Sequence, residues 1–368
     1  ADGWSKAKPL YPMPLKRGIT PFNHQILAFN IGLNLNYVAL LMEQGCGKSL
    51  TAVALAGYWF LNKLIKRVLI FAPASVIAVW PREFNDYAGF PNYVLPLIGP
   101  VSARVSQIEN IELLLRTNPQ LQSEMIVAVT NYEASWRMED ALIKFKPDLV
   151  ICDESQRIKG FSSEQTKAVT RIGKGAKYRM ILTGTPVSQG PIDFFAQYRF
   201  LDPAIFGYTV GGFKNRYCIM GGFNGRQIVA YTNQDELIRK AHSIAFRCTK
   251  AECLDLPEQI DQVLYCELEP AARKIYNQLK SECVAECGDG KAITAANVVV
   301  KLLRLSQLTG GFVGADNLET GELKVTQVSS AKLKLLSETL DDLMGAGKKV
   351  VIGTRFRAEI NEIGAMLQ

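Results

Sequence analysis

Glu43-Gln44-Gly45-Cys46-Gly47-Lys48-Ser49 is the segment that decides the fold of this chain. The apolar run Tyr37–Met42 precedes it, and the apolar run Leu50–Ala56 follows it. An apolar run, a glycine turn and a second apolar run predict a strand, a tight loop and a helix. Amides of such a loop and of the helix N-terminus converge on an anion, so the segment predicts a phosphate-binding loop.

Each polar or glycine position of the loop has an expected role. Gly45 and Gly47 permit a close backbone approach, and Lys48 would place its charge on the β and γ phosphates. Ser49 would direct its hydroxyl to magnesium. The full pattern G-x-x-x-x-G-K-[ST] requires a glycine where Met42 stands. An ordinary glycine turn at a helix start therefore stays open as an alternative at this point.

Bulk composition is that of a soluble globular protein with more than one core. The chain has 368 residues, 48% hydrophobic and 21% charged, so two domains are expected. No apolar run approaches the roughly 20 residues that span a bilayer, and the first residues contain no apolar signal core. We expect no membrane contact and a cytoplasmic location, or a nuclear one in a eukaryote. The net charge of +7 is compatible with a polyanionic partner.

The eight cysteines form no disulfide framework, and we interpret them as reduced thiols. Cys248 with Cys253 and Cys283 with Cys287 are close in sequence, but neither pair has the C-x-x-C spacing and only two histidines exist. These counts favour free thiols over a zinc site.

Continuous apolar runs in the first half predict strands buried on both faces, which indicates an α/β fold with a helix-covered parallel sheet. The runs are Tyr37–Met42, Arg67–Ala72, Tyr93–Ile98, Met125–Thr130, Asp148–Cys152 and Tyr178–Thr183. Ser102 and Ser163 are predicted to cap helices. From residue 201 to 231, clustered glycines predict an irregular, partly helical protrusion. Further on, strands are expected at 262–268 and 349–354, and helices from Pro270, Ala295 and Ala331.

A second informative stretch is Asp148-Leu149-Val150-Ile151-Cys152-Asp153-Glu154, a buried strand that ends in two adjacent carboxylates. Neighbouring side chains of an extended chain diverge, so one carboxylate can face a metal ion and the other a water. Asp153 would then hold magnesium with Ser49, and Glu154 would orient and deprotonate the attacking water. An acidic turn at a strand end is the alternative when the pair is considered alone.

A third stretch, Thr183-Gly184-Thr185-Pro186, also follows a predicted strand. Its hydroxyl groups could sense the γ-phosphate site and relay its state. On its own, this turn could equally be structural.

The order of the three stretches resembles the first RecA-like lobe of superfamily-two helicases, and more closely the Swi/Snf-type translocases of double-stranded DNA. The resemblance extends from about Pro21 to the C-terminal end. It also includes segments similar to motif Ia (Phe71–Trp80, with Glu83), motif Ib (Val129–Glu133), the Asp-Glu-Ala-His box (Asp153–Lys159), motif III (Leu182–Leu201), the segment that bridges the lobes (Arg216–Cys218, Phe246–Lys250, Leu256–Glu258) and motif IV (Val350–Phe356).

This resemblance implies a complete first RecA-like lobe and a partial second RecA-like lobe with helical insertions. It places the first lobe in residues 1–200, a helical protrusion and linker in 201–250, and the start of the second lobe in 251–368. The implied cofactors are ATP and magnesium, and the implied partner is double-stranded DNA. A monomer from a compact bacterial or phage member is expected, with no protein partner indicated.

The resemblance also implies residue roles. Lys48, Asp153 and Glu154 would be catalytic, and Gln25 would read adenine. The nucleotide-binding set is Gln25, Gly45, Cys46, Gly47, Lys48, Ser49 and Leu50. Coupling would involve Gln156, Thr183, Gly184 and Thr185. Contacts to DNA phosphates would come from Ser75, Thr130, Asn131 and Lys159.

Several positions depart from the family pattern. Ser155 and Gln156 stand where Ala and His are usual, and Gln can still hydrogen-bond toward motif III. Cys46 and Ser49 replace a common Leu and Thr. The printed sequence ends at Gln368, before motifs V and VI with their arginine fingers, so a truncated chain that hydrolyses ATP weakly by itself is expected.

Two other functions stay open. One is a strand-separating helicase on DNA or RNA. The other is a nucleotide-gated DNA-binding scaffold with little turnover.

Overall fold

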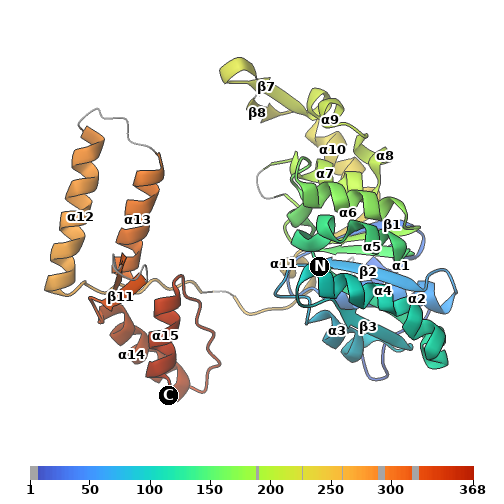
Figure 1. The fold of residues 1–368 in the computed structure, drawn as a ribbon, viewed down its shortest axis with the longest axis horizontal. Coiled ribbons are helices and arrows are strands. Elements are labelled where there is room, and N and C mark those ends of the chain that lie inside the picture. The colour runs from blue at the N-terminus through green and yellow to red at the C-terminus, as the bar shows by residue number, and fades with distance from the viewer. Residues whose placement is uncertain (1–6, 188–189, 226, 259, 289–294, 317–322) are drawn as a thin grey trace. The chain divides into compact units, whose positions relative to one another are not determined.

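The computed structural model describes the chain except residues 1–6, 188–189, 226, 259, 289–294 and 317–322 (Figure 1). The described chain divides into two compact units, Ala1–Pro257 and Glu258–Gln368. Among the described residues, no helix is both long enough and apolar enough to cross a membrane.

The first unit is built on a seven-stranded sheet with the order β3-β4-β2-β5-β6-β1-β9, in which every pairing is parallel. Its strands are β1 (Tyr37–Met42), β2 (Arg67–Ala72), β3 (Asn92–Pro96), β4 (Met125–Asn131), β5 (Leu149–Asp153), β6 (Tyr178–Leu182) and β9 (Ala245–Cys248). The predicted strands in the first half are confirmed, with ends shifted by a residue or two. β9 lies in the range assigned to the protrusion and linker, and its short run gave too little pattern to predict a strand.

Successive residues of the strands feed two apolar clusters, one on each face of the sheet. In β1, Val38, Leu40 and Met42 pack into one cluster, whereas Ala39 and Leu41 pack into the other. This alternation follows from the two-residue period of a strand. Because both faces are covered, the strand reads as a continuous apolar run.

Helices cover the two faces of this sheet (Figure 1). They are α1 (Asn23–Leu33), α2 (Lys48–Leu61), α3 (Trp80–Tyr87), α4 (Val101–Thr117), α5 (Glu139–Lys144), α6 (Glu164–Lys174) and α7 (Asp193–Leu201), with 3-10 turns η2 (Pro119–Ser123), η3 (Tyr132–Arg137) and η4 (Ser155–Ile158). α2, which directly follows the glycine loop, is buried over most of its length, as its apolar sequence predicts.

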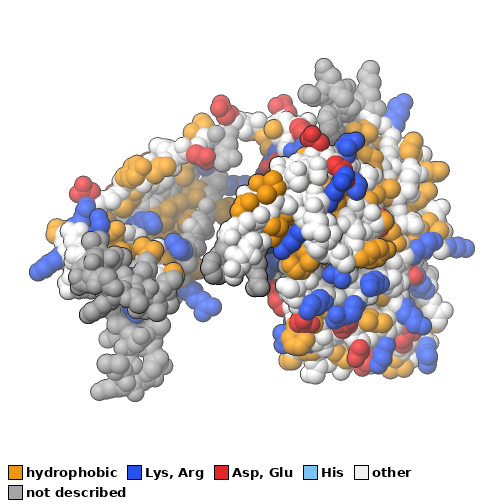
Figure 2. Space-filling model, turned by 90° about the horizontal axis from the view of Figure 1, so that it is seen from above, with side chains coloured by type: hydrophobic (Ala, Val, Ile, Leu, Met, Phe, Trp, Pro, Cys, Tyr) orange, Lys and Arg blue, Asp and Glu red, His pale blue; other side chains and the backbone are white. Residues whose placement is uncertain are grey.

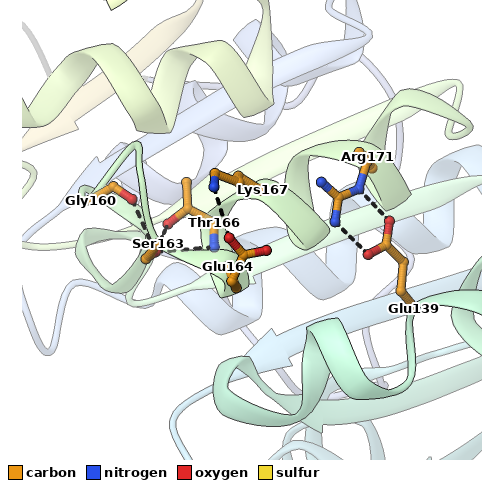
Figure 3. A network of polar contacts seen from close by, with 7 residues as sticks. All are labelled: Glu139, Gly160, Ser163, Glu164, Thr166, Lys167 and Arg171. Carbon is orange, nitrogen blue, oxygen red and sulfur yellow. Dashed lines mark hydrogen bonds and ion pairs between the residues drawn. The ribbon is translucent and has the colours of Figure 1, made fainter.

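The start of α6 shows why a helix begins where it does (Figure 3). Ser163 Oγ accepts a hydrogen bond from the Thr166 amide at 3.3 Å, so the predicted cap is confirmed. The Glu164–Lys167 pair and the Arg171 fork on Glu139 of α5 line the same helix in Figure 3. The predicted Ser102 cap is wrong. α4 begins at Val101 after Pro100, whose ring holds a backbone angle suited to a helix start.

The predicted protrusion contains short helices and a hairpin. Its elements are α8 (Pro203–Phe206), α9 (Val210–Tyr217), β7 (Cys218–Gly221), η5 (Phe223–Gly225), β8 (Gln227–Tyr231) and α10 (Gln234–His242). The β7–β8 ribbon projects beyond the helices of the first unit in Figure 1. α11 (Lys250–Cys253) follows β9 and ends the regular structure of this unit.

The second unit carries four helices and one hairpin among its described residues. They are α12 (Pro270–Gly288), α13 (Ala295–Thr309), β10 (Phe312–Asp316), β11 (Leu323–Gln327), α14 (Ala331–Gly345) and α15 (Arg357–Met366). The three predicted helix starts are confirmed. The strands predicted at 262–268 and 349–354 are wrong: both segments lie outside any sheet, and Val351 is 96% exposed. An apolar run becomes a strand only when a neighbouring backbone pairs with it.

Leu55 and Leu61 of α2 offer a matched test of this packing, since Leu55 is buried and Leu61 is 54% exposed. Leu55→Ala should lower the free energy of unfolding of the first unit by about 2–5 kcal/mol. Leu61→Ala should change it by less than about 0.5 kcal/mol. Urea titration followed by tryptophan fluorescence measures both, because Trp59, Trp80 and Trp136 lie in the first unit. Equal losses would contradict the assigned burial.

Candidate active site

The residues predicted to form the site meet at the carboxyl end of the parallel strands. β5, β6 and β1 are neighbours and run parallel, so their carboxyl ends lie side by side. The glycine loop follows β1, Asp153 ends β5, and Thr183 follows β6. In open parallel sheets, ligands bind at the carboxyl ends of the strands.

The loop has the backbone that its glycines allow. Gly45 and Gly47 adopt positive φ angles of 85° and 83°, a region that side chains disfavour. Gly47 is also the residue before the first turn of α2. A Cβ at Gly47 would collide with the Gln25 side-chain amide. Both glycines are therefore required for this shape.

Two side chains of α1 hold the loop in place. The Cys46 carbonyl lies 2.8 Å from His24 Nε2 and accepts a hydrogen bond from Gln25 Nε2 at 3.3 Å. Gln25 Oε1 accepts from the Phe22 amide at 3.0 Å, which fixes the side chain. Gln25 thus lies against the loop, next to the nucleotide-binding residues predicted with it, and its contact with adenine stays a prediction.

Lys48 and Ser49, the residues predicted to contact phosphate and magnesium, have neighbours within the protein. Lys48 Nζ donates to the Met42 carbonyl at 3.1 Å, so the ammonium must leave this carbonyl to reach a phosphate. Burial raises the pKa of Glu83 on α3, while a hydrogen bond from the Ser49 side chain opposes this rise. Ser49 therefore lies near enough to Glu83 for its side chain to affect the pKa of the Glu83 carboxyl.

Asp153 is a buried carboxylate held by neighbours. Oδ2 accepts from Trp80 Nε1 at 3.1 Å, and Oδ1 accepts from the Glu154 amide at 3.0 Å. Its carbonyl accepts from Tyr132 Oη at 2.6 Å. Burial, and then the charge of Glu154, raise the pKa of Asp153 to about 6, whereas the charge of Lys48 acts in the opposite direction. Lys48 and Asp153 are close enough for their charges to interact.

These groups suit a magnesium ion bound with a nucleotide. The Ser49 hydroxyl and the Asp153 carboxylate are hard oxygen donors, the kind that magnesium prefers. A second positive charge near Asp153 would also offset the burial that raises its pKa. Ser49 and Asp153 are thus the candidate protein ligands.

Glu154 has a strained backbone and a fixed side chain. Its φ of 49° and ψ of 56° are left-handed, which is uncommon for a residue with a Cβ. Gln156 Nε2 donates to Glu154 Oε2 at 2.9 Å. The strained turn and this bond set the direction of the Glu154 carboxylate, as expected of a residue that must orient a water.

The four predicted coupling residues form one continuous set of contacts. Thr183 Oγ1 donates to Gln156 Oε1 at 2.8 Å, and Thr183 Oγ1 accepts from the Thr185 amide at 3.0 Å. Gly184 packs on the phosphate loop, since a Cβ there would lie 3.2 Å from the Gln44 amide nitrogen. Gln156 at the histidine position of the family therefore keeps the link to motif III.

The residues predicted to contact DNA are not equally accessible. Ser75 is exposed, whereas Asn131 and Lys159 are half-buried. Asn131 already accepts from Arg104 Nη1 at 2.5 Å and donates to Glu133 Oε2 at 2.8 Å. Thr130 is fully buried and its hydroxyl has no hydrogen-bond partner among the described residues, so in this structure it belongs to the core. Figure 2 shows basic side chains interspersed with acidic and apolar ones on the viewed face, without a continuous band of one charge.

Sequence reasoning missed several residues of the site. Trp80 is buried, as its large apolar ring predicts, but it also binds Asp153. Glu83 lies three residues further on the same helix and reaches Ser49. Lys250 donates its amide to Glu43 Oε2 at 2.8 Å, and its side chain lies beside Gly45. The resemblance includes Trp80 and Glu83 in motif Ia and Lys250 in the bridging segment, but it gave none of the three a role at this site.

Comparison with known protein families agrees with this geometry. The profile described as SNF2-related domain matches residues 23–309. The chain belongs to this family. Its α/β fold with a parallel sheet is that of the SNF2 ATPase core.

Similar proteins span phage, animals and archaea. The putative protein p41 of Acyrthosiphon pisum secondary endosymbiont phage 1 is 25% identical over 362 residues, which cover 94% of this chain and 74% of that protein. DNA repair and recombination protein RAD54-like of Drosophila persimilis is 27% identical over 292 residues, covering 74% of this chain and 36% of that protein. The chain therefore spans about a third of that RAD54-like relative.

The fold matches a solved ATPase core. The Sulfolobus solfataricus SWI2/SNF2 ATPase core in complex with double-stranded DNA aligns with a TM-score of 0.54 and 22% identity, covering 98% of this chain and 71% of that one. At this identity the match establishes the fold.

The raised pKa of Asp153 predicts a pH-dependent stability of the nucleotide-free protein. The folded chain holds this proton more tightly than the unfolded chain, so the group adds stability below about pH 4 that is lost as the pH rises through about 6. Asp153→Asn should therefore stabilise the chain above about pH 6, by up to about 3 kcal/mol, and have little effect below about pH 4.

Thermal denaturation across this pH range measures the effect. Asp140→Asn is the control, because Asp140 is exposed and should show no such trend. A stabilisation by Asp153→Asn that is independent of pH would contradict the assignment.

Proposed function

We propose that this chain is the ATP-driven core of a motor that translocates on double-stranded DNA. The observation that carries the proposal is the hydrogen-bonded connection from Glu154 through Gln156 to Thr183 and Thr185. It links the residue assigned to the attacking water with the segment that packs on the phosphate loop. Family membership and the fold shared with a DNA-bound core support the same function.

Hydrolysis uses groups of this chain in defined roles. Amides of the loop between Gly45 and Ser49 bind the phosphate oxygens, and Lys48 moves from the Met42 carbonyl to the β and γ phosphates. Ser49 and Asp153 would hold magnesium, which would supply positive charge to offset the charge on the phosphates. Glu154 orients the attacking water and accepts its proton.

Changes at the γ-phosphate can reach the rest of the chain through the coupling residues. Loss of the γ-phosphate changes the hydrogen bonding of Glu154, and Gln156 senses this through the bond to Glu154 Oε2. Thr183 transmits the shift to the turn around Gly184, which lies on the loop. Lobe closure in a motor requires contacts that differ between the state with the γ-phosphate and the state without it.

We propose that Ser75, Asn131 and Lys159 contact the phosphates of one DNA strand. Ser75 is exposed, and Asn131 would exchange its contacts with Arg104 and Glu133 for a phosphate. Contacts of this type position a duplex without reading its sequence, and their strength falls with salt. ATP and double-stranded DNA are thus the proposed ligands, with a monomer as the working unit.

The coupling role can be separated from catalysis at Thr183. Thr183→Val removes the hydroxyl that donates to Gln156 and keeps the side-chain shape. We expect ATP affinity to change less than about threefold, while the stimulation of turnover by duplex DNA falls by at least about tenfold, because the change removes both the bond to Gln156 and the bond from the Thr185 amide.

Thr183→Ser restores the hydroxyl and should restore the stimulation. ATP binding by fluorescence titration and ATPase rates with and without duplex measure the two quantities. Unchanged stimulation in Thr183→Val would contradict the coupling role.

The function itself is tested with the protein that carries this sequence, on four DNA substrates: a duplex, a single strand, a triplex and a forked duplex. Duplex DNA should stimulate ATP turnover more than single strands do, and the protein should displace a third strand from a triplex without separating a forked duplex. Glu154→Gln should keep ATP binding and lose about 10²–10⁴ in turnover.

Unwinding of the fork would favour a helicase instead. DNA retention that depends on ATP, without turnover in the unmodified protein, would favour a nucleotide-gated scaffold. Full turnover by Glu154→Gln would remove Glu154 from its assigned role.

A further inference from the structure

Cys46 of the phosphate loop meets two cysteines from a segment about 200 residues later, Cys248 and Cys253. Cys46 lies in the loop, Cys248 ends β9, and Cys253 ends α11. Their sulfur atoms all lie within 4.8 Å of one another, and the Sγ atoms of Cys46 and Cys253 are 3.5 Å apart. Among the described histidine, cysteine, aspartate and glutamate residues, these three bring their ligand atoms close enough together to hold one metal ion.

The backbone holds this cluster in place. β1 and β9 pair with Met42 opposite Cys248, and the Glu43 amide donates to the Cys248 carbonyl at 3.0 Å. Glu43 Oε2 in turn accepts from the Lys250 amide at 2.8 Å. Hydrogen bonds from Glu43 therefore join the start of the loop to Cys248 and Lys250. All three thiols belong to the same compact unit.

The sulfur positions match the requirements of a metal centre. A tetrahedral zinc ion with Zn–S bonds of about 2.3 Å places its sulfur ligands about 3.8 Å apart. The Cys46–Cys253 separation of 3.5 Å is close to this value, and all three sulfur atoms lie within 4.8 Å of one another. Cys46 and Cys248 are buried, whereas Cys253 is partly exposed, so an ion could enter from the Cys253 side and solvent could supply a fourth ligand.

We propose that Cys46, Cys248 and Cys253 form a binding site for a thiophilic metal ion such as Zn²⁺. Thiolate ligands select soft ions, whereas the Ser49 and Asp153 oxygens select magnesium, so the two sites take different metals. An ion bound by the three thiols fastens the phosphate loop to the last strand of the sheet. The bound form is then more stable than the metal-free form.

Apolar packing and disulfide formation are the two alternatives to metal binding at this cluster. Free cysteines also act as small apolar side chains, and in that case the three thiols only fill space and bind no ion. A disulfide between Cys46 and Cys253 would engage two thiols and leave Cys248 without a role. Metal binding gives a role to all three thiols.

Cobalt(II) tests the site directly, because thiolate ligation produces sulfur-to-cobalt charge-transfer absorbance and a tetrahedral site produces strong d–d bands. The reduced, metal-free full chain should bind one equivalent of cobalt(II) with both signals, and Zn²⁺ should displace it. Cys253→Ser should weaken cobalt binding by at least about tenfold, since even loss of a residue that only hydrogen-bonds to a metal ligand lowers metal affinity by about this factor. Cys266→Ser is the control, because Cys266 is an exposed cysteine outside the cluster.

A second measurement shows whether the variant still folds. Thermal melts followed by circular dichroism should show that Cys253→Ser is folded in the absence of metal. Zn²⁺ should raise the melting temperature of the unmodified chain and of Cys266→Ser, but not that of Cys253→Ser.

Absence of charge-transfer absorbance in the natively folded, reduced chain would overturn the proposal. So would equal cobalt affinity in Cys253→Ser, or a Cys46–Cys253 disulfide found by mass spectrometry in place of bound metal. None of these readouts requires ATP or DNA, so failure of the metal site and failure of the motor function are distinguishable.

Discussion

The parallel pairing of β5, β6 and β1 is the constraint on which the rest of the site depends. It brings the glycine loop, Asp153 and Thr183 together at the carboxyl ends of the strands, although they are far apart in sequence. The charge of Lys48 then acts on the carboxylate of Asp153, which burial alone would keep protonated over a wider pH range. In the proposed function, a nucleotide and magnesium would add their charges in the same place.

Coupling follows from how tightly the same end of the sheet is hydrogen-bonded. Glu154, Gln156 and Thr183 each use a side-chain atom to contact the next residue, and Thr185 adds its amide. The strained backbone of Glu154 is maintained by this environment. A change at any one member would alter its neighbours, and this is the basis of the proposed link between chemistry at the γ-phosphate and movement of the turn.

Much of the first unit could be predicted because its strands are buried on both faces and therefore read as uninterrupted apolar runs. β9 could not, since four residues carry too little pattern, and its partner β1 lies about 200 residues earlier. The strands predicted at 262–268 and 349–354 have a clear apolar pattern, but no neighbouring strand pairs with them among the described residues of the second unit.

The site was predictable where chemistry is local and unpredictable where it depends on tertiary contacts. Lys48, Ser49, Asp153 and Glu154 are recognisable from loop and strand-end patterns. The burial of Thr130 depends on how β4 is covered, and the thiol cluster requires Cys46 to meet residues of a distant strand. Pairwise spacing of Cys248 and Cys253 gave no sign of the third thiol.

One measurement tests the central claim most directly: a crystal structure of this chain with magnesium and a non-hydrolysable ATP analogue. We expect Lys48 Nζ on the β and γ phosphates, and a magnesium ion about 2.0–2.1 Å from the Ser49 hydroxyl with Asp153 bound directly or through one water. A nucleotide bound to the loop with Asp153 on a different face of the sheet would contradict the account.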